Sequence, residues 1–427
     1  MEKYKLGEIA TVEISGADKK IKDGEKKIRL CNFVDVYYNW AITIAQHDSF
    51  MPATARPNEI SKFQLRKGQV ALTKDSETRD DIGISTYIAD DFDDVILGYH
   101  CALITPQRNI LDGSYLNAIL HTKYAKKYFA CNASGSGQRY ALSVEALNSF
   151  PIPKIPLSEQ KRIGEIFSSL DKKIELNRRI NQNLEAMAKQ LYDYWFVQFD
   201  FPDENGRPYK ASGGKMVWND KLKREIPKGW NTAFVKDIAA TYSGGTPKST
   251  NAEYYDNGKI PWINSGELNS SIITKTTNYI TESGLNNSSA KLYPCNSILV
   301  AMYGATAGKV SLLTFEACSN QAVCGVMPII DEMLFYIYLY ISSLYNHFIT
   351  LSTGSARDNI SQDTIKNILL PLPTNKIAIE FNKRIRCLYQ MMINNCQEMD
   401  ILTKQRDELL PLLMNGQVSV NSDLSDD

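Results

Sequence analysis

Two stretches of the chain carry apolar residues at alternating steps of four and three positions, from Ile163 to Trp195 and from Phe381 to Leu413. These steps average 3.5 residues, so a helix with this pattern keeps one seam facing a partner helix. The pattern predicts two long helices, although ordinary amphipathic helices packed on their own domains remain an alternative. The seam positions are Ile163, Phe167, Leu170, Ile174, Asn177, Asn181, Leu184, Ala188, Leu191 and Trp195, then Phe381, Ile385, Leu388, Met392, Asn395, Met399, Leu402, Arg406, Leu409 and Leu413.

The two helical stretches belong to an internal repeat. At a constant offset of 218 positions (143 to 361), Ser143 falls on Ser361 and Leu184 on Leu402. Identity between the copies is low, but the apolar rhythm is shared. Because repeats determine architecture, we expect the order globular segment, long helix, globular segment, long helix.

The segments before each helix, residues 1–150 and about 229–370, contain short β-branched and aromatic runs broken by Gly, Asn, Ser and Pro. Such runs are typical of strands. Each segment also holds one helix-like stretch, Tyr115 to Phe129 and Met333 to Phe348. Residues 200–228 are rich in Pro and Gly and indicate a linker.

Composition limits the classes of function. The 427 residues exceed one ordinary domain, and 48 basic residues balance 48 acidic ones. A protein that binds DNA by bulk charge is usually basic, so nucleic-acid binding here must be local or shared with a partner. Eight scattered Cys and four isolated His favour neither disulfides nor zinc, and a polar N-terminus without a signal sequence indicates the cytoplasm.

Sequence signatures of catalysis are missing. The chain has no Pro-Pro, so it lacks an amino-methyltransferase signature, and no GxGxxG follows an expected strand. Gly304 to Lys309 differs from a phosphate loop, with three residues between its glycines and Val310 at the magnesium-binding position. Glu159-Gln160-Lys161 partly imitates a nuclease site, but we interpret it as a capping turn in which Ser158 caps the helix. We expect no catalytic residue, metal or cofactor in this chain.

Several loops of the two globular segments combine Gly with hydroxyl, amide, aromatic and basic side chains. Such groups can bond phosphates or read base edges. The alternative is that they are plain turns, as in any β-rich domain. The candidate DNA-binding residues are Lys74, Arg79, Ser136, Gln138, Arg139 and Tyr140 in the first segment, and Ser243, Thr246, Lys248, Asn264, Tyr303, Thr306, Lys309, Ser355, Arg357 and Asn359 in the second.

These motifs resemble a known family. Pro156 to Ile163 followed by Leu170 to Ile174 closely resembles the central conserved region of type I restriction-modification specificity subunits. The first globular segment departs from the family because it lacks clear copies of the Ser-Gly-Gly-Thr-Pro and Ile-Pro-Trp motifs. Further matches are Trp218, Arg224 to Trp230, Ser243 to Pro247, Ile260 to Trp262, Tyr303 to Lys309 and Arg406 to Gly416.

The resemblance implies an α+β fold in which two β-rich target-recognition domains are separated by two long antiparallel coiled-coil helices with pseudo-two-fold symmetry. In an antiparallel pair, Asn181 would face Asn395 and Asn177 would lie near Met399, fixing the register. The expected parts are a first recognition domain at 1–155, a spacer helix at 156–199, a linker at 200–228, a second recognition domain at 229–372, a second spacer helix at 373–416 and a disordered acidic tail at 417–427.

The resemblance further implies that each domain reads one half of an asymmetric, bipartite site in double-stranded DNA. The helices would set the gap and dock two modification (methyltransferase) subunits, and restriction (ATP-dependent endonuclease) subunits would join them. S-adenosylmethionine, ATP and magnesium would belong to those partners. Two alternatives remain open: a self-contained restriction or methylation enzyme, and a coiled-coil scaffold that does not bind DNA.

Overall fold

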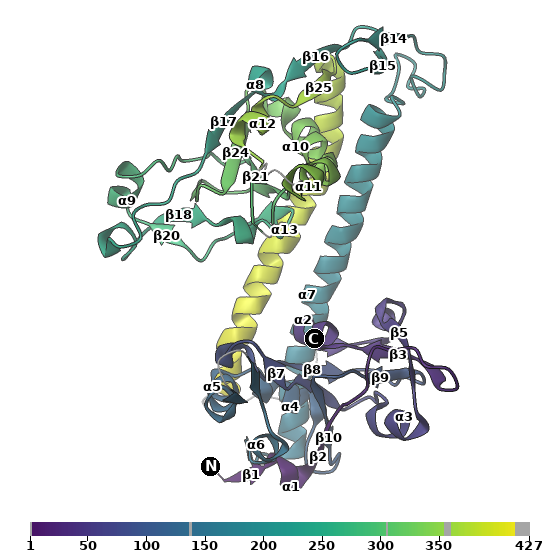
Figure 1. Cartoon of the computed structure of the whole chain (residues 1–427), viewed down its shortest axis with the longest axis vertical. Coiled ribbons are helices and arrows are strands. Elements are labelled where there is room, and N and C mark those ends of the chain that lie inside the picture. The colour runs from purple at the N-terminus through teal and green to yellow at the C-terminus, as the bar shows by residue number, and fades with distance from the viewer. Residues whose placement is uncertain (1, 136–138, 305, 354–359, 415–427) are drawn as a thin grey trace, which may run out of the picture. The chain divides into compact units, whose positions relative to one another are not determined.

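A computed structural model describes residues 2–135, 139–304, 306–353 and 360–414 (Figure 1). The chain divides into two compact units. Unit 1 comprises Met1–Leu176 and Met399–Asp427, and unit 2 comprises Asn177–Glu398. Unit 1 is therefore built from two separate pieces of the chain, and the 222 residues of unit 2 (177–398) lie between them.

The two predicted long helices are present. Helix α7 spans Leu157–Tyr192 and continues into a π-helical turn, Asp193–Val197, whereas α13 spans Asn375–Met414. The prediction that Ser158 caps α7 is wrong, because the carbonyl of Pro156 accepts the hydrogen bonds from Glu159 N and Gln160 N and Ser158 already lies in the first turn. Both helices contribute residues to both units.

Helix α7 is attached to unit 1 by Gln160, whose side chain is 4% exposed. Its Nε2 donates to the carbonyls of Ile110 and Ile155 at 2.9 and 3.1 Å, and its Oε1 accepts from Asp112 N at 2.9 Å. The amide thus satisfies three backbone groups that would otherwise be unpaired at the start of the helix. Gln160 has a structural role rather than a place in a nuclease site.

The seam positions of α7 are all buried or half-buried. In unit 2, Asn177 Nδ2 donates to Glu398 Oε2 at 2.7 Å, and Asn181 Oδ1 accepts from Asn395 Nδ2 at 2.8 Å. Increasing numbers along α7 meet decreasing numbers along α13, so the helices run antiparallel, as expected. In α13 the described side chains at the seam are likewise buried or half-buried, and the side chain of Leu413 lies outside the described set.

The last turns of α13 belong to unit 1. Leu409 packs on the core that contains Ile163 and Phe167 of α7, and the Arg406 guanidinium lies 5.0 Å from the centre of the Trp40 ring. These contacts join the end of the chain to its first globular segment.

Unit 1 is organised around a five-stranded sheet with strand order β2-β10-β6-β8-β4. The pairs β2/β10, β10/β6 and β6/β8 are antiparallel and β8/β4 is parallel. Smaller sheets have the orders β5-β3-β9, β11-β12-β7 and β1-β13. The elements are β1 Lys3–Lys5, α1 Leu6–Ile9, β2 Ala10–Ile14, β3 Lys26–Cys31, α2 Phe33–Tyr38, β4 Ala41–Ile42, β5 Met51–Ala55, α3 Pro57–Phe63, β6 Val70–Thr73, β7 Asp75–Ser76, β8 Ser85–Ile88, β9 Val95–Leu97, β10 Cys101–Pro106, α4 Gly113–Leu120, α5 Lys123–Asn132, β11 Ser134–Gly135, β12 Tyr140–Ala141, α6 Val144–Asn148 and β13 Pro151–Pro153.

Unit 2 repeats this topology. Its five-stranded sheet has the order β17-β24-β21-β22-β19, again with three antiparallel pairs followed by one parallel pair. Its smaller sheets are β20-β18-β23, β16-β25 and the hairpin β14-β15. The elements are β14 Met216–Asn219, β15 Arg224–Pro227, β16 Asn231–Phe234, α8 Val235–Ile238, β17 Ala239–Ser243, β18 Ile260–Ile263, β19 Ile272–Ile273, β20 Tyr279–Ile280, α9 Glu282–Asn286, β21 Ile298–Ala301, β22 Val310–Leu313, β23 Cys318–Ser319, β24 Val323–Pro328, α10 Leu334–Ser343, α11 Tyr345–Thr353, α12 Gln362–Lys366 and β25 Leu369–Leu372.

Each helix-like stretch of the sequence forms two consecutive helices, α4 with α5 and α10 with α11.

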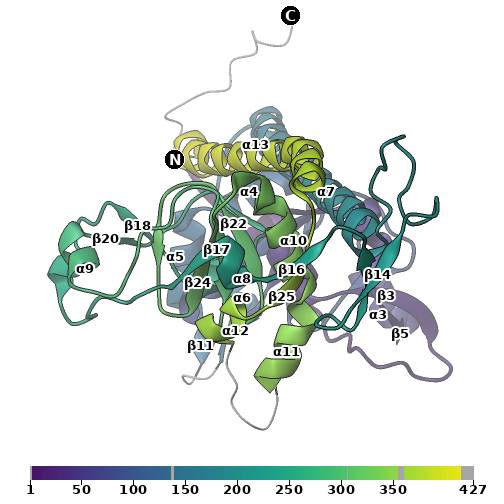
Figure 2. The same cartoon turned by 90° about the horizontal axis from the view of Figure 1, so that it is seen from above.

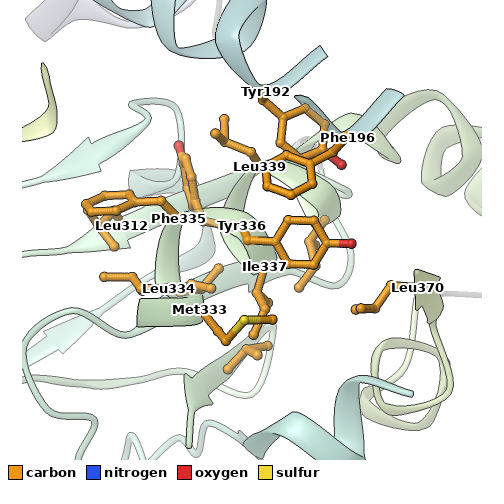
Figure 3. Packing of buried hydrophobic residues seen from close by; sticks show 14 of the residues in the cluster. Tyr192, Phe196, Leu312, Met333, Leu334, Phe335, Tyr336, Ile337, Leu339 and Leu370 are labelled. Atoms are coloured by element: carbon orange, nitrogen blue, oxygen red, sulfur yellow. The ribbon is translucent and has the colours of Figure 1, made fainter. Parts of the chain in front are cut away.

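The core of unit 2 packs α10 against the end of α7. Figure 3 shows Tyr192 and Phe196 over Tyr336, and the Phe196 and Tyr336 ring centres are 4.6 Å apart. In the views of Figures 1 and 2, α9, β18 and β20 lie together at one end of the second globular segment.

The stretch expected as a linker, residues 200–228, contains the β14–β15 hairpin. Phe201 stacks on Trp230 with ring centres 5.4 Å apart, so this stretch is packed on unit 2. In the part of the chain that the structure describes, no helix is long and apolar enough to cross a lipid bilayer.

Candidate nucleic-acid interface

The described candidate residues lie in or beside loops at corresponding strand ends of the two units. In unit 1 they follow β6 or lie on β12, which pairs with β7. In unit 2 they follow β17, β18 and β21. Because β6 and β21 occupy the same place in their sheets, each unit presents its polar loops at the equivalent edge.

In unit 1 the edge is organised by Asp75, whose side chain is 8% exposed. Its Oδ1 accepts from Lys74 Nζ at 2.9 Å, and its Oδ2 is in close contact with His100 Nδ1. Arg139 Nη2 lies 3.5 Å from the same Oδ2. Burial alone would raise the pKa of Asp75, but the hydrogen bonds from His100 and Lys74 outweigh this effect. The pKa therefore lies below its usual value, and the carboxylate stays charged.

Arg79 and Tyr140 form a second pair beside this cluster. The Arg79 guanidinium lies 5.0 Å from the centre of the Tyr140 ring, an arrangement that orients an exposed cation over an aromatic face. Tyr140 itself is held by β12, which pairs with Ser76 of β7. Two further candidates of this segment, Ser136 and Gln138, lie outside the described residues.

Asp75, His100 and Arg139 line an open cavity of about 720 Å³. Helix α2 forms an aromatic wall, and Tyr37 of this wall donates to both carboxylate oxygens of Asp81 at 2.8 Å. The cavity is lined by Phe33, Val34, Tyr37, Tyr38, Asp75, Ser76, Glu77, Thr78, Asp81, His100 and Arg139.

In unit 2 a network of amides, hydroxyls and one carboxylate occupies the equivalent edge. Asn264 Oδ1 accepts from Asn320 Nδ2 at 3.2 Å, and Asn264 N donates to Glu267 Oε1 at 2.9 Å. Thr306 is buried and donates from Oγ1 to the carbonyl of Ser265 at 2.8 Å.

The loop after β17 is connected to neighbouring segments. Thr246 is hydrogen-bonded to Gln321, and Ser243 Oγ donates to Gln362 Oε1 at 3.0 Å. Lys248 is exposed. Ser243 and Thr246 therefore have structural partners, whereas the Lys248 side chain projects to solvent.

Tyr303 and Lys309 come from the same motif but lie in different surroundings. Tyr303 is half-buried beside the β21 edge, and burial raises its pKa. Lys309 Nζ donates to Asn269 Oδ1 at 2.6 Å and lines a cavity of about 300 Å³ together with Glu185 and Lys189 of α7. The candidates Ser355, Arg357 and Asn359 lie outside the described residues.

Strand register reveals counterparts that the sequence comparison missed. Asn32 N donates to Asp35 Oδ2 at 2.7 Å directly after β3, just as Asn264 N donates to Glu267 after β18. The Ile-Pro-Trp motif thus has a structural counterpart in β3, whose sequence is different. The spacing Asn-x-x-Asp after β3 and Asn-x-x-Glu after β18 was the sequence signal that could have revealed this correspondence.

A matched glycine marks the turn before β8 and β22. Gly83 and Gly308 have φ values of +80° and +79°. A Cβ on Gly83 would lie 2.4 Å from the Phe129 ring, and one on Gly308 would lie 3.0 Å from Phe348 Cβ. Gly308 of the Tyr303–Lys309 motif and Gly83 of unit 1 therefore each allow a left-handed turn that packs on a phenylalanine.

The described residues contain no group of three or more His, Cys, Asp or Glu side chains placed to hold a metal ion. Fold and site together define a two-domain α+β protein with matched polar edges on a pair of antiparallel helices.

Comparison with known proteins gives the family. The model of the type I restriction modification DNA specificity domain matches residues 1–186 and 227–386, and the chain belongs to this family. The type I restriction enzyme HindI specificity subunit of Haemophilus influenzae is 28% identical over 410 residues, covering 84% of this chain and 88% of that protein. The MjaIX specificity subunit of Methanocaldococcus jannaschii is 28% identical over 322 residues, covering 73% and 72%.

A solved structure supports the fold. The crystal structure of the type I restriction-modification S subunit from M. genitalium matches with a TM-score of 0.56 at 15% identity, covering 96% of this chain and 95% of that chain.

Proposed function

We propose that this chain is the DNA specificity subunit of a type I restriction-modification complex. Each unit reads one half of an asymmetric, bipartite site in double-stranded DNA, and the paired helices set the gap between the halves. The helices also dock two modification subunits, which restriction subunits join.

The observation that carries this proposal is the repeated topology with a polar edge at the same place in each copy. A duplicated domain whose two edges carry different side chains is suited to reading two different half-sites. The first edge carries Lys74, Arg79 and Arg139, and the second combines amides and hydroxyls with Lys248 and Lys309. Direct contacts to base edges specify sequence, whereas contacts to phosphates position the protein.

We propose further that the chain supplies recognition but not chemistry. S-adenosylmethionine, ATP and magnesium would be bound by the partner subunits. Balanced charge fits this division, because partners can supply part of the surface that neutralises DNA phosphates.

Methyl transfer tests the division of labour. The purified chain, incubated with labelled S-adenosylmethionine and mixed DNA, should transfer no methyl groups. Adding the modification subunits should produce methylation at one bipartite motif. Robust transfer by the chain alone would refute the proposal, and methylation by the partners without a motif that depends on this chain would refute its role in specificity.

A further inference from the structure

The cluster around Asp75 in unit 1 holds one arginine in a defined orientation. Arg139 Nη2 lies 2.8 Å from His100 Nδ1, 3.1 Å from His100 Nε2 and 3.5 Å from Asp75 Oδ2. All of these contacts use Nη2. Among the described residues these contacts do not involve Nε or Nη1, and the Arg139 side chain is 59% exposed. A guanidinium has five N–H donors, of which Nη2 carries two. The second N–H of Nη2 can therefore pair with a neighbouring N–H of Nη1 or Nε to form a fork for a ligand.

The His100 ring lies between the buried carboxylate and the exposed arginine. Its Nδ1 is in close contact with Asp75 Oδ2, and both ring nitrogens lie within 3.1 Å of Arg139 Nη2. The ring therefore connects Asp75 to Arg139.

The backbone of His100 is strained in a way that fits such a role. Its φ is +73°, in the left-handed region that non-glycine residues rarely adopt. Its carbonyl accepts from Lys74 N at 3.0 Å, which ties the turn to the strand end that carries Asp75. Strained residues of this kind persist where the surrounding structure holds them, often at functional sites.

The cavity beside Arg139 suits the edge of a base better than a phosphate. Its lining includes three carboxylates, Asp75, Glu77 and Asp81, which would repel a phosphate. A base edge in the major groove offers both acceptors and donors. The acceptor pair N7 and O6 of guanine matches the paired N–H groups of arginine.

We propose that Arg139 reads a guanine in the half-site contacted by unit 1, and that His100 and Asp75 are the positioning residues that hold its guanidinium. This inference rests on the proposed function, and it adds which residue reads, which base it reads and how the residue is held.

Unit 2 provides an internal control. The bond from Lys74 N to the His100 carbonyl corresponds to the 2.8 Å bond from Met302 N to the Ala322 carbonyl. Ala322 therefore stands where unit 1 has His100, and Tyr303 follows Met302 where Asp75 follows Lys74. The second edge has no ionisable imidazole at this point, so its half-site should not respond to the changes below.

The experiment uses the complex of the full chain with its modification subunits, on duplexes that carry the methylated motif or single-base replacements. Arg139→Ala should reduce discrimination at one guanine of the first half-site about ten- to hundredfold, leaving the gap and the second half-site unchanged. His100→Ala should relax the same position, and His100→Gln should restore it because an amide can both donate to Asp75 and accept from Arg139. Arg108→Ala is the matched control, since Arg108 bonds the Lys67 carbonyl beyond the opposite end of β10.

Two outcomes would overturn the inference. An Arg139→Ala complex that keeps full discrimination at every position would show that this arginine does not read a base. Equal weakening on all duplexes with a lower salt dependence would show a phosphate contact instead. In both cases the wild-type motif would still be bipartite, so failure of this inference is distinct from failure of the proposed function.

Discussion

His121 is a half-buried histidine of unit 1 whose surroundings fix its charge state. Its ring centre is 4.3 Å from that of Trp40, and its Nε2 donates to the Ser85 carbonyl at 2.8 Å. Burial lowers the pKa of His121 to about 3, although the Ser85 carbonyl opposes that shift. The folded protein therefore holds this ring neutral.

The lowered pKa predicts acid sensitivity of unit 1. An unfolded histidine binds its proton at about pH 6.5, so between about pH 6.5 and pH 3 the unfolded state binds more protons, and stability falls as pH falls. The slope attributable to His121 is at most about 1.4 kcal/mol per pH unit. Hydrogen exchange in α4 during urea titration should show that His121→Gln, which keeps a donor for Ser85, flattens this fall. A wild-type slope in the variant would contradict the assignment.

At the scale of residues, the sequence predicted individual candidates but not their associations. Lys74, Arg79 and Arg139 were chosen because cations in Gly- and Ser-rich loops are suited to DNA. Asp75 and His100, which orient Arg139, were missed because they lie 25 positions apart and meet only through the strand register. Whether each candidate contacts DNA stays a prediction.

Among the elements, the helix pair in unit 2 is fixed by amides in its seam. Asn181 accepts from Asn395 and also donates from Nδ2 to the Met392 carbonyl at 3.1 Å and to Cys396 Sγ at 3.3 Å. A shift along the helices would leave these amides unpaired, whereas leucine would tolerate several registers. The amides therefore lower the stability of the helix pair but define its register.

A double-mutant cycle tests this exchange. Asn181→Leu or Asn395→Leu alone should lower the free energy of unfolding by about 1–3 kcal/mol, because each leaves a half-buried amide without its partner. The double variant should be as stable as the wild type or more stable, since both polar groups are gone. Urea unfolding measures all three, with Gln182→Leu on the exposed face of α7 as control. Additive losses in the double variant would refute the coupling.

The heptad rhythm predicted both long helices and their seam because burial of one face follows directly from sequence period. It did not predict the π-helical turn at Asp193–Val197. There Tyr192, Trp195, Phe196 and Phe199 are all buried, so the aromatic residues no longer define one stripe. The β14–β15 hairpin in the expected linker was missed because Pro and Gly are as typical of the turns in a folded hairpin as of a linker.

At the scale of the whole molecule, the topological repeat predicts modular specificity. Replacing the first globular segment by that of another family member should change one half of the methylated motif and leave the other half and the gap unchanged. The exchanged segment must keep Trp40 and the backbone at Asp112, which contact Arg406 and Gln160. Methylome sequencing provides the result, and a change in both halves would show that the units do not read independently.

The proposed role of the helices predicts how the gap responds to their length. Inserting seven residues after Leu176 and seven after Glu398 preserves the seam and adds about 10 Å to each helix, or about three base pairs of DNA. The methylated motif should then gain a longer gap with both half-sites intact. A gap that stays constant would show that the helices do not set it.

The two-piece construction of unit 1 has a consequence for synthesis. Unit 2 is encoded without interruption, so all of its residues are synthesised before the second piece of unit 1. Unit 1 begins first but must wait for Arg406 and Leu409, which cover Trp40 and the core around Phe167. A premature stop codon shortly before Arg406 would therefore damage the domain encoded at the opposite end of the gene and spare the nearer one.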